Sequence, residues 1–170
     1  MNDTSTINKN KKKVGGWLLL FIATLIIIYP ISSFMKISWI LNRINLLGEQ
    51  YPKFTTYGIL AIVLTTLIAI LGIYAGILLF RLKSNSLKIV KIFLILKILI
   101  TCLDNFLLIN SGVLADVIYG VAIAYKLSPE ASKEVLTKVG TKNVLQSLAY
   151  SGVWYAYLIN SKRVKDTYNF

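Results

Sequence analysis

Lys97, Thr101 and Asp104 are the residues of this chain whose types and spacing could do chemistry. They interrupt an otherwise apolar run, IVKIFLILKILITCLDNFLLIN, at residues 89–110. Seven residues advance a helix by nearly two turns, so Lys97 and Asp104 share one face about 10 Å apart along the axis, with Thr101 between them. Ionisable groups at membrane depth cost roughly 2.5–3.5 kcal/mol each, and they normally face a bundle interior, a partner or water. We call these three residues the polar stripe.

Two interpretations of the polar stripe are open at this point. In the functional interpretation, it lines a route for a proton, an ion or a solute. In the structural interpretation, Lys97 extends toward the cytoplasmic surface, while Asp104 bonds Thr101, Asn105 or a neighbouring helix. Direct contact between Lys97 and Asp104 is not expected at their separation.

The composition removes most other chemistries. The chain has no histidine and a single cysteine, Cys102. Thiolate–imidazole catalysis and an intrachain disulfide are therefore excluded, and most metal-site templates are removed. The sequence contains no phosphate-binding loop and no paired carboxylates. We therefore expect a protein that is not an enzyme and that carries no cofactor or metal.

The apolar content predicts an all-α integral membrane protein. Hydrophobic residues make up 56% of the 170 residues, against about 45–50% in soluble domains. A spanning helix needs about 20 mainly apolar residues. We therefore predict a bundle of four transmembrane helices, with spans at about residues 16–36, 57–80, 88–110 and 141–161.

Short extra helices are expected in the two outer loops. In residues 37–56, apolar residues at helical spacing predict a short helix lying on the bilayer surface, namely Ile37, Ile40, Leu41, Ile44 and Leu47. Ser128 and Pro129 predict the start of a polar helix that ends at Gly140. Residues 113–125 either extend the third span or form a separate interfacial helix. Pro30 predicts a kink in the first span.

The distribution of charge predicts the orientation. The chain carries 19 Lys and Arg against 7 Asp and Glu, a net charge of +12. Basic residues near span ends favour the cytoplasmic side, so we expect both termini in the cytoplasm of a bacterial cell, at its inner membrane. Residues 1–14 are then a disordered basic cytoplasmic tail, 15–163 the membrane domain and 164–170 a second cytoplasmic tail. The basic residues lie beside apolar runs, so the expected partner is anionic lipid, with no role for nucleic acid.

Small residues indicate where helices pack closely. Gly72 and Gly76 form a G-x-x-x-G pair inside an apolar run, the spacing that lets two helix backbones approach. Packing within the chain is the favoured interpretation, with Ser151 and Gly152 of the last span as partners, and self-association is the alternative.

The end of the last span is a candidate contact for lipid head groups. Trp154 and Tyr157 precede Lys162 and Arg163. An aromatic belt followed by a stop-transfer charge cluster is the simpler interpretation. A ring stack beside cations that holds an anionic lipid is the sharper one.

Two short motifs resemble a known family. They are Trp154-x-x-Tyr157-x-x-x-Ser161-Lys162-Arg163-Val164-x-x-Thr167 and Gly16-Trp17-Leu18-Leu19-Leu20. Together with the span layout, they resemble the bacterial inner-membrane family catalogued as domain of unknown function 2569. Tyr168 stands where that family's pattern has phenylalanine. The resemblance implies a small multi-span membrane protein and supplies no catalytic or ligand residues.

Two functions follow from these features. The leading hypothesis is a non-enzymatic accessory protein that packs against itself, another membrane protein or lipid. The alternative is a small oligomeric transporter or channel subunit that uses Lys97, Thr101 and Asp104. The alternative requires that Lys97 and Asp104 face inward and reach water.

Overall fold

A computed structural model describes residues 16–110, 115–118, 122, 126 and 128–168 of the chain. This part of the chain is helical, with no strand. Its elements are α1 (Trp17–Ala23), η1 (Thr24–Ile28), α2 (Tyr29–Leu47), α3 (Pro52–Phe80), α4 (Ser86–Asn110), α6 (Pro129–Asn160) and α7 (Lys162–Tyr168). The expected all-α class is therefore confirmed. The expected tail at residues 1–14 lies outside the described residues.

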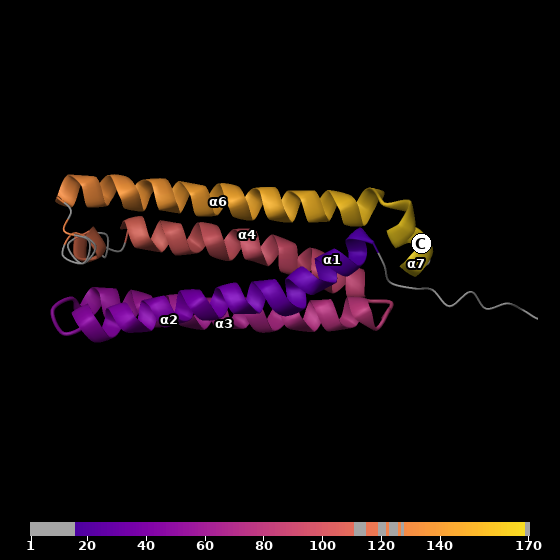
Figure 1. The fold of residues 1–170 in the computed structure, drawn as a ribbon, viewed down its shortest axis with the longest axis horizontal. Coiled ribbons are helices and arrows are strands. Elements are labelled where there is room, and N and C mark those ends of the chain that lie inside the picture. The colour runs from indigo at the N-terminus through magenta and orange to yellow at the C-terminus, as the bar shows by residue number, and fades with distance from the viewer. Residues whose placement is uncertain (1–15, 111–114, 119–121, 123–125, 127, 169–170) are drawn as a thin grey trace, which may run out of the picture.

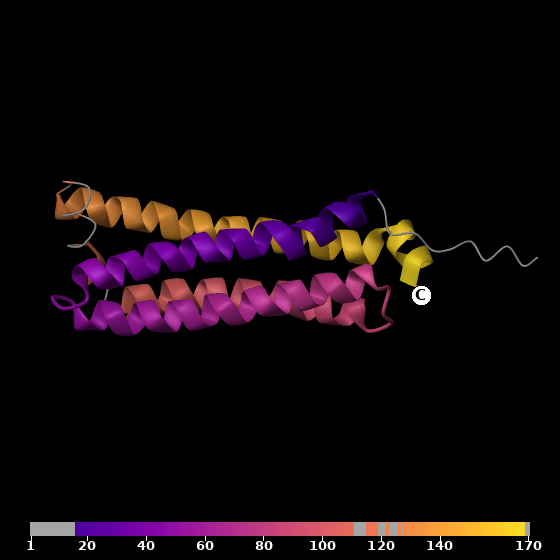
Figure 2. The same cartoon turned by 60° about the horizontal axis from the view of Figure 1, so that its bottom comes forward.

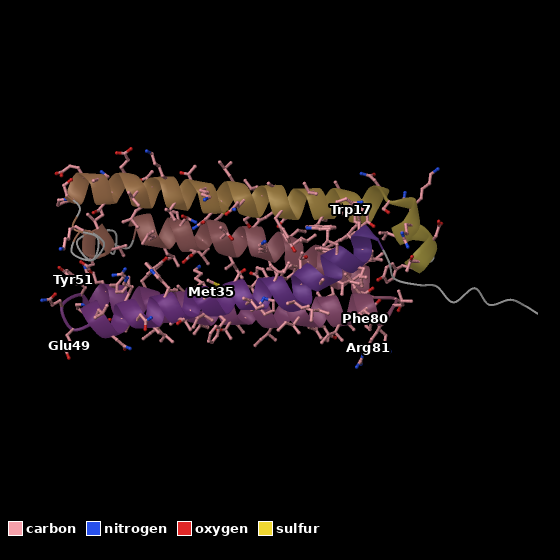
Figure 3. The ribbon with its side chains drawn as sticks, in the orientation of Figure 1. Trp17, Met35, Glu49, Tyr51, Phe80 and Arg81 are labelled. Atoms are coloured by element: carbon pink, nitrogen blue, oxygen red, sulfur yellow. The ribbon has the colours of Figure 1, made fainter. Side chains whose placement is uncertain are left out.

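Four long helices lie side by side (Figures 1 and 2). The segments α1, η1 and α2 join without a break, and we call them together the first helix. The first helix packs mainly on α3, α3 packs on α4, and α4 packs on α6. In Figure 3, Glu49 and Tyr51 mark one end of the bundle, whereas Phe80 and Arg81 mark the other, where α7 also lies. We call these the Glu49 end and the Arg81 end.

The outside of the bundle is rich in apolar side chains. Met35 on the first helix and Val153 on α6 are 67% and 65% exposed, and they are two of many large apolar side chains at the surface. Two helices of the described chain, Trp17–Leu46 and Pro52–Phe80, are long and apolar enough to cross a membrane. Large contiguous apolar surfaces are rare on soluble monomers. The described surface is therefore suited to an apolar environment.

The loop predicted at residues 37–56 is much shorter in the structure, because only residues 48–51 lie between α2 and α3. The apolar residues of 37–47 continue the first helix to Leu47 and do not form a separate surface helix, so this expectation is wrong. Their helical spacing is in register with the span before them, and nothing in the sequence breaks the helix there. The helix α3 begins at Pro52, where the fixed φ of proline suits the first helical position.

The helix α6 passes through Gly140. Ser128 is its N-cap, since its Oγ accepts a hydrogen bond from the Ala131 N–H at 3.2 Å, as expected. The expected end at Gly140 is wrong, because the helix continues to Asn160. A Cβ at Gly140 would lie only 2.6 Å from Oδ1 of Asn105. The glycine therefore allows close approach of α4 and does not end the helix. Residues 113–125 lie largely outside the described residues.

The C-terminal segment is folded against the bundle and is not a free tail. Ser161 has extended backbone angles and ends α6, and α7 then turns back over the Arg81 end (Figure 1). Val164 of α7 is fully buried, and the Tyr168 hydroxyl donates to the Leu79 carbonyl at 2.7 Å. Burial raises the pKa of Tyr168 to about 12. Burial of Val164 explains why residues 164–168 fold instead of remaining free.

Gly72 and Gly76 pack within the chain. A Cβ at Gly76 would lie 2.6 Å from Cγ1 of Ile26, and one at Gly72 would lie 3.0 Å from Cε2 of Phe93. Their neighbours therefore come from the first helix and α4, and not from α6 as expected. Of the two expected partners on α6, Ser151 is buried but is not among the atoms nearest to either glycine. No atom lies within 4 Å of a Cβ placed on Gly152.

The π-helical turn η1 lies opposite Gly76. It occupies Thr24–Ile28 and ends two residues before Pro30. A proline ring clashes with the carbonyl four residues earlier, here that of Ile26, and a wider turn relieves such a clash. The kink at Pro30 stays a prediction, while η1 places Leu25 and Ile26 against Gly76.

Replacing Gly76 by leucine should destabilise the bundle, because the new side chain has no space against Ile26. Overpacking of this kind costs about 1–3 kcal/mol. Gly152→Leu is the matched control, since its position is open. We expect Gly76→Leu to lower the thermal unfolding temperature in detergent by several degrees and Gly152→Leu to leave it nearly unchanged. Equal effects would contradict the packing described for Gly76.

Candidate functional site

The helix α4 presents the polar stripe to a cavity between the four long helices. Lys97, Thr101 and Asp104 all line it. Its volume is about 550 Å³, within the range of roughly 300–1,000 Å³ that is usual for ligand pockets. We call this cavity the polar chamber. Its other polar lining residues are Thr24, Tyr29, Ser32, Ser33 and Lys36 of the first helix, Thr65 of α3, Asn105 of α4, and Asn143, Gln146, Ser147 and Tyr150 of α6.

Asp104 joins three helices. Its Oδ2 lies 2.9 Å from Nζ of Lys36 on the first helix, and its Oδ1 accepts a hydrogen bond of 2.8 Å from the Tyr57 hydroxyl on α3. The Asp104 side chain is 20% exposed and that of Lys36 is 47% exposed. The carboxylate therefore has both a cation and a hydroxyl donor as partners. Of the expected partners, a neighbouring helix is confirmed, whereas Thr101 and Asn105 bond elsewhere.

Lys97 lies between aromatic rings. Its Nζ is 3.6 Å from the ring centroid of Tyr150 on α6 and 5.2 Å from that of Tyr29 on the first helix. No carboxylate in the described part of the chain forms an ion pair with it. Cation–π contacts contribute about 0.5–1 kcal/mol at exposed sites and about 2 kcal/mol or more where water is excluded. The expectation that Lys97 extends to the cytoplasmic surface is wrong, because the two rings hold it in the polar chamber.

Thr101 and Asn105 lie on the same face of α4. Thr101 Oγ1 donates to the Lys97 carbonyl at 2.8 Å and lies 3.3 Å from Ser147 Oγ of α6. Asn105 Nδ2 donates to the Thr101 carbonyl at 2.8 Å. The stripe thus contacts α6 at Lys97 and Thr101, the first helix at Lys97 and Asp104, and α3 at Asp104.

An aromatic layer lies between the polar chamber and the Arg81 end. Phe21 of the first helix stacks on Trp154 of α6, with centroids 4.4 Å apart and planes at 22°. One turn further along, Thr24 Oγ1 and the Tyr150 hydroxyl are 3.1 Å apart. Thr24 donates its proton to the Phe21 carbonyl, so the Tyr150 hydroxyl is the donor to Thr24. These contacts hold the first helix against α6.

The candidate head-group residues are divided between the core and the surface. Trp154 is partly buried against Phe21, and Tyr157 packs edge-on against Trp154, with ring centroids 5.7 Å apart. Lys162 and Arg163 are exposed. A Cβ at Gly16 would lie 2.7 Å from Nη1 of Arg163, so that guanidinium lies beside the start of the first helix. Trp154 and Tyr157 thus pack on each other in partly buried positions and the two cations are at the surface, so the head-group site stays a prediction.

Four residues of the site were not identified from the sequence. Lys36 ends the predicted first span, and it is the first charge after an uncharged run and opposite in sign to Asp104. Tyr57 begins the predicted second span, where its position alone does not indicate a polar partner. The sequence does not indicate that Tyr29 and Tyr150 meet over Lys97, because they lie far apart along the chain and both occur in spans where aromatic residues are common.

Comparison with known proteins identifies a family but no activity. The sequence matches the family described as "Protein of unknown function (DUF2569)" over residues 11–169. No curated protein and no solved structure matches the chain. The family match agrees with the resemblance of the two short motifs. Function must therefore be argued from the polar chamber.

Replacing Asp104 by asparagine should destabilise the bundle, because Lys36 and Tyr57 both lose a charged acceptor. Hydrogen bonds to charged groups contribute about 1.5–3 kcal/mol each when buried. The expected loss is about 1–2 kcal/mol, because Lys36 is partly exposed and its pairing is screened. Thermal unfolding in detergent would measure it.

The pair Glu134–Lys138 on α6 is the control, since its side chains are 66% and 75% exposed. Exposed pairs contribute about 0–1 kcal/mol. Glu134→Gln should therefore change the unfolding temperature little. If Asp104→Asn is equally mild, Asp104 does not hold the helices together.

Proposed function

Because the chain belongs to the DUF2569 family, whose description assigns no activity, we propose a function from the polar chamber: the protein is a non-enzymatic four-span membrane protein that binds and passes a small polar solute. The observation that carries this proposal is that all three residues of the polar stripe face a chamber to which every long helix contributes. The polar stripe thus faces inward, as the transporter hypothesis requires.

The depth of the chamber supports a role beyond packing. Lys97 lies near the middle of α4, whose bounds are Ser86 and Asn110. Placing a charge at such a depth in a membrane is costly, and such groups usually mark a pathway or binding site. Hydroxyls and amides from the first helix and α6 add donors and acceptors around it. Packing alone does not require this concentration of polar groups.

Four spans account for the lengths of the helices and their apolar exteriors. The two most apolar helices are long enough to cross a membrane. The helices α4 and α6 have 25 and 32 residues, and about 20 residues cross a bilayer. The polar chamber is lined by Lys97 and Asp104 of α4 and by Ser147 of α6, while exposed apolar side chains such as Leu99 and Val153 would face lipid.

The Arg81 end is the proposed cytoplasmic end. Arg81, Lys83 and Lys88 follow α3 or begin α4, and Lys162 and Arg163 lie near the C-terminus at the same end. Basic residues favour the cytoplasmic side of the bacterial inner membrane. Both termini are then cytoplasmic, and exposed Lys162 and Arg163 are available to anionic lipid.

Association with a partner is the second candidate role. Its support is the uncovered Gly152 on an outward face of α6, beside exposed Leu148 and Val153. Small residues on such a face let another helix approach closely. A second copy of this chain, or another membrane protein, would fit there. Four helices seldom enclose a route alone, so self-association is also compatible with solute passage.

Cysteine accessibility tests whether water reaches the polar chamber. In a Cys102→Ala background, Asn105→Cys places a thiol in the chamber, and Leu103→Cys places one two residues away on the exposed apolar face. A thiol reacts as the thiolate, which requires water. We expect a membrane-impermeant methanethiosulfonate reagent to label Asn105→Cys in intact cells and to leave Leu103→Cys unlabelled. An unreactive Asn105→Cys would refute the proposed function.

Reporter fusions test the four-span topology. Alkaline phosphatase fused after Glu49 or Lys126 should be active, because these positions are proposed to be outside. Green fluorescent protein fused after Lys83 or Phe170 should fluoresce, because these positions are proposed to be cytoplasmic. If the Lys83 and Phe170 fusions reported opposite sides of the membrane, the chain would have a different number of spans.

A further inference from the structure

Among the described residues, the polar chamber has one cation without an anionic partner, Lys97. We infer that the chamber binds an oxyanion group, a carboxylate or a phosphate, at Lys97. This inference rests on the proposed function and adds the charge and chemical class of the ligand.

The charged side chains that line the chamber sum to a net positive charge. Its lining includes two cations, Lys36 and Lys97, and one anion, Asp104. Asp104 is paired with Lys36 at 2.9 Å, so these two charges neutralise each other. Lys97 has no ion pair within the described ranges. An entering ligand therefore meets one uncompensated positive charge.

The ammonium group of Lys97 faces aromatic rings and has no conventional hydrogen-bond acceptor among the described residues. An ammonium group has three N–H donors. The rings of Tyr150 and Tyr29, at 3.6 and 5.2 Å, stabilise the charge through their faces. They are not conventional acceptors. No acceptor for Nζ occurs among the hydrogen bonds of the described residues. An oxyanion would supply both the negative charge and the acceptor oxygens.

The neighbouring side chains suit the same ligand. The amides of Asn143 and Gln146 and the hydroxyl of Ser147 line the chamber on α6, the helix that carries Tyr150. Amide and hydroxyl groups donate hydrogen bonds to oxyanions without adding charge. A cation is disfavoured, because Lys97 would repel it and Asp104 already has Lys36 and Tyr57 as partners. The site therefore selects for negative charge.

A ligand of this class has two sources. It is either a free organic or inorganic anion from the aqueous phase, or the head group of an anionic lipid. Both present the same oxygen atoms to Lys97, so the chemistry of recognition is shared. Separate probes in one experiment distinguish the sources.

Thermal unfolding of the purified full-length protein in detergent tests the inference. The probes are acetate, citrate and inorganic phosphate at matched ionic strength, and phosphatidylglycerol in mixed micelles with phosphatidylcholine as the neutral control. We expect at least one anionic probe to raise the unfolding temperature by several degrees. The apparent affinity should fall at least tenfold in Lys97→Met and remain close to wild type in Lys97→Arg.

Lys138→Met is the matched control, because Lys138 is exposed on α6 and is not part of the chamber lining. It should respond to the probes as wild type does. A response to a soluble probe identifies a free anion as the ligand, and a response to phosphatidylglycerol alone identifies a lipid head group. If no probe gives a shift that depends on Lys97, the inference is overturned.

Protection from labelling keeps the test informative if Lys97→Met does not fold. The same probes should slow the reaction of Asn105→Cys at least threefold, with Lys97 intact. Labelling that no anionic probe slows would overturn the oxyanion site and leave the proposed function standing. An absence of labelling would instead refute the proposed function itself.

Discussion

The carboxylate of Asp104 lies where three helices meet, and the arrangement of the polar chamber depends on it. Lys36 and Tyr57 approach its two oxygens from the first helix and α3. A charge surrounded by apolar side chains needs such partners, because unpaired it would be costly to desolvate. The pairing places the polar side chains Ser32 and Ser33 of the first helix toward the chamber.

A second set of contacts acts at the other end of the chamber. There Phe21 stacks on Trp154, and Tyr150 bonds Thr24, so the first helix is held against α6. The space between these contacts and Asp104 is lined by hydroxyls, amides and Lys97. A chamber bounded in this way can retain polar groups inside a bundle whose exterior is apolar. Within the described residues, Lys97 has no ion pair in this chamber, and on this the inferred preference for anions rests.

The C-terminal motif that resembles the family has a structural explanation. Trp154 and Tyr157 form the aromatic layer, Ser161 ends α6, and Val164 is buried where α7 folds over the Arg81 end. These residues close one end of the bundle and do not contribute to the polar chamber. The motif therefore reports how this fold is assembled, and the residues that distinguish the chamber lie outside it.

The sequence by itself determined the helical class, the long apolar helices, the Ser128 cap and the common face of Lys97, Thr101 and Asp104. Each of these depends on composition or on the 3.6-residue period, which are local properties. It did not determine that the first helix continues to Leu47 or that α6 continues through Gly140. The end of a helix also depends on packing against neighbouring helices and on the turn that follows it. Only the tertiary structure decided that Lys36 pairs with Asp104 and that Tyr29 and Tyr150 enclose Lys97. Those contacts join residues far apart in the chain, and their partners are selected by helix packing, which no local pattern encodes.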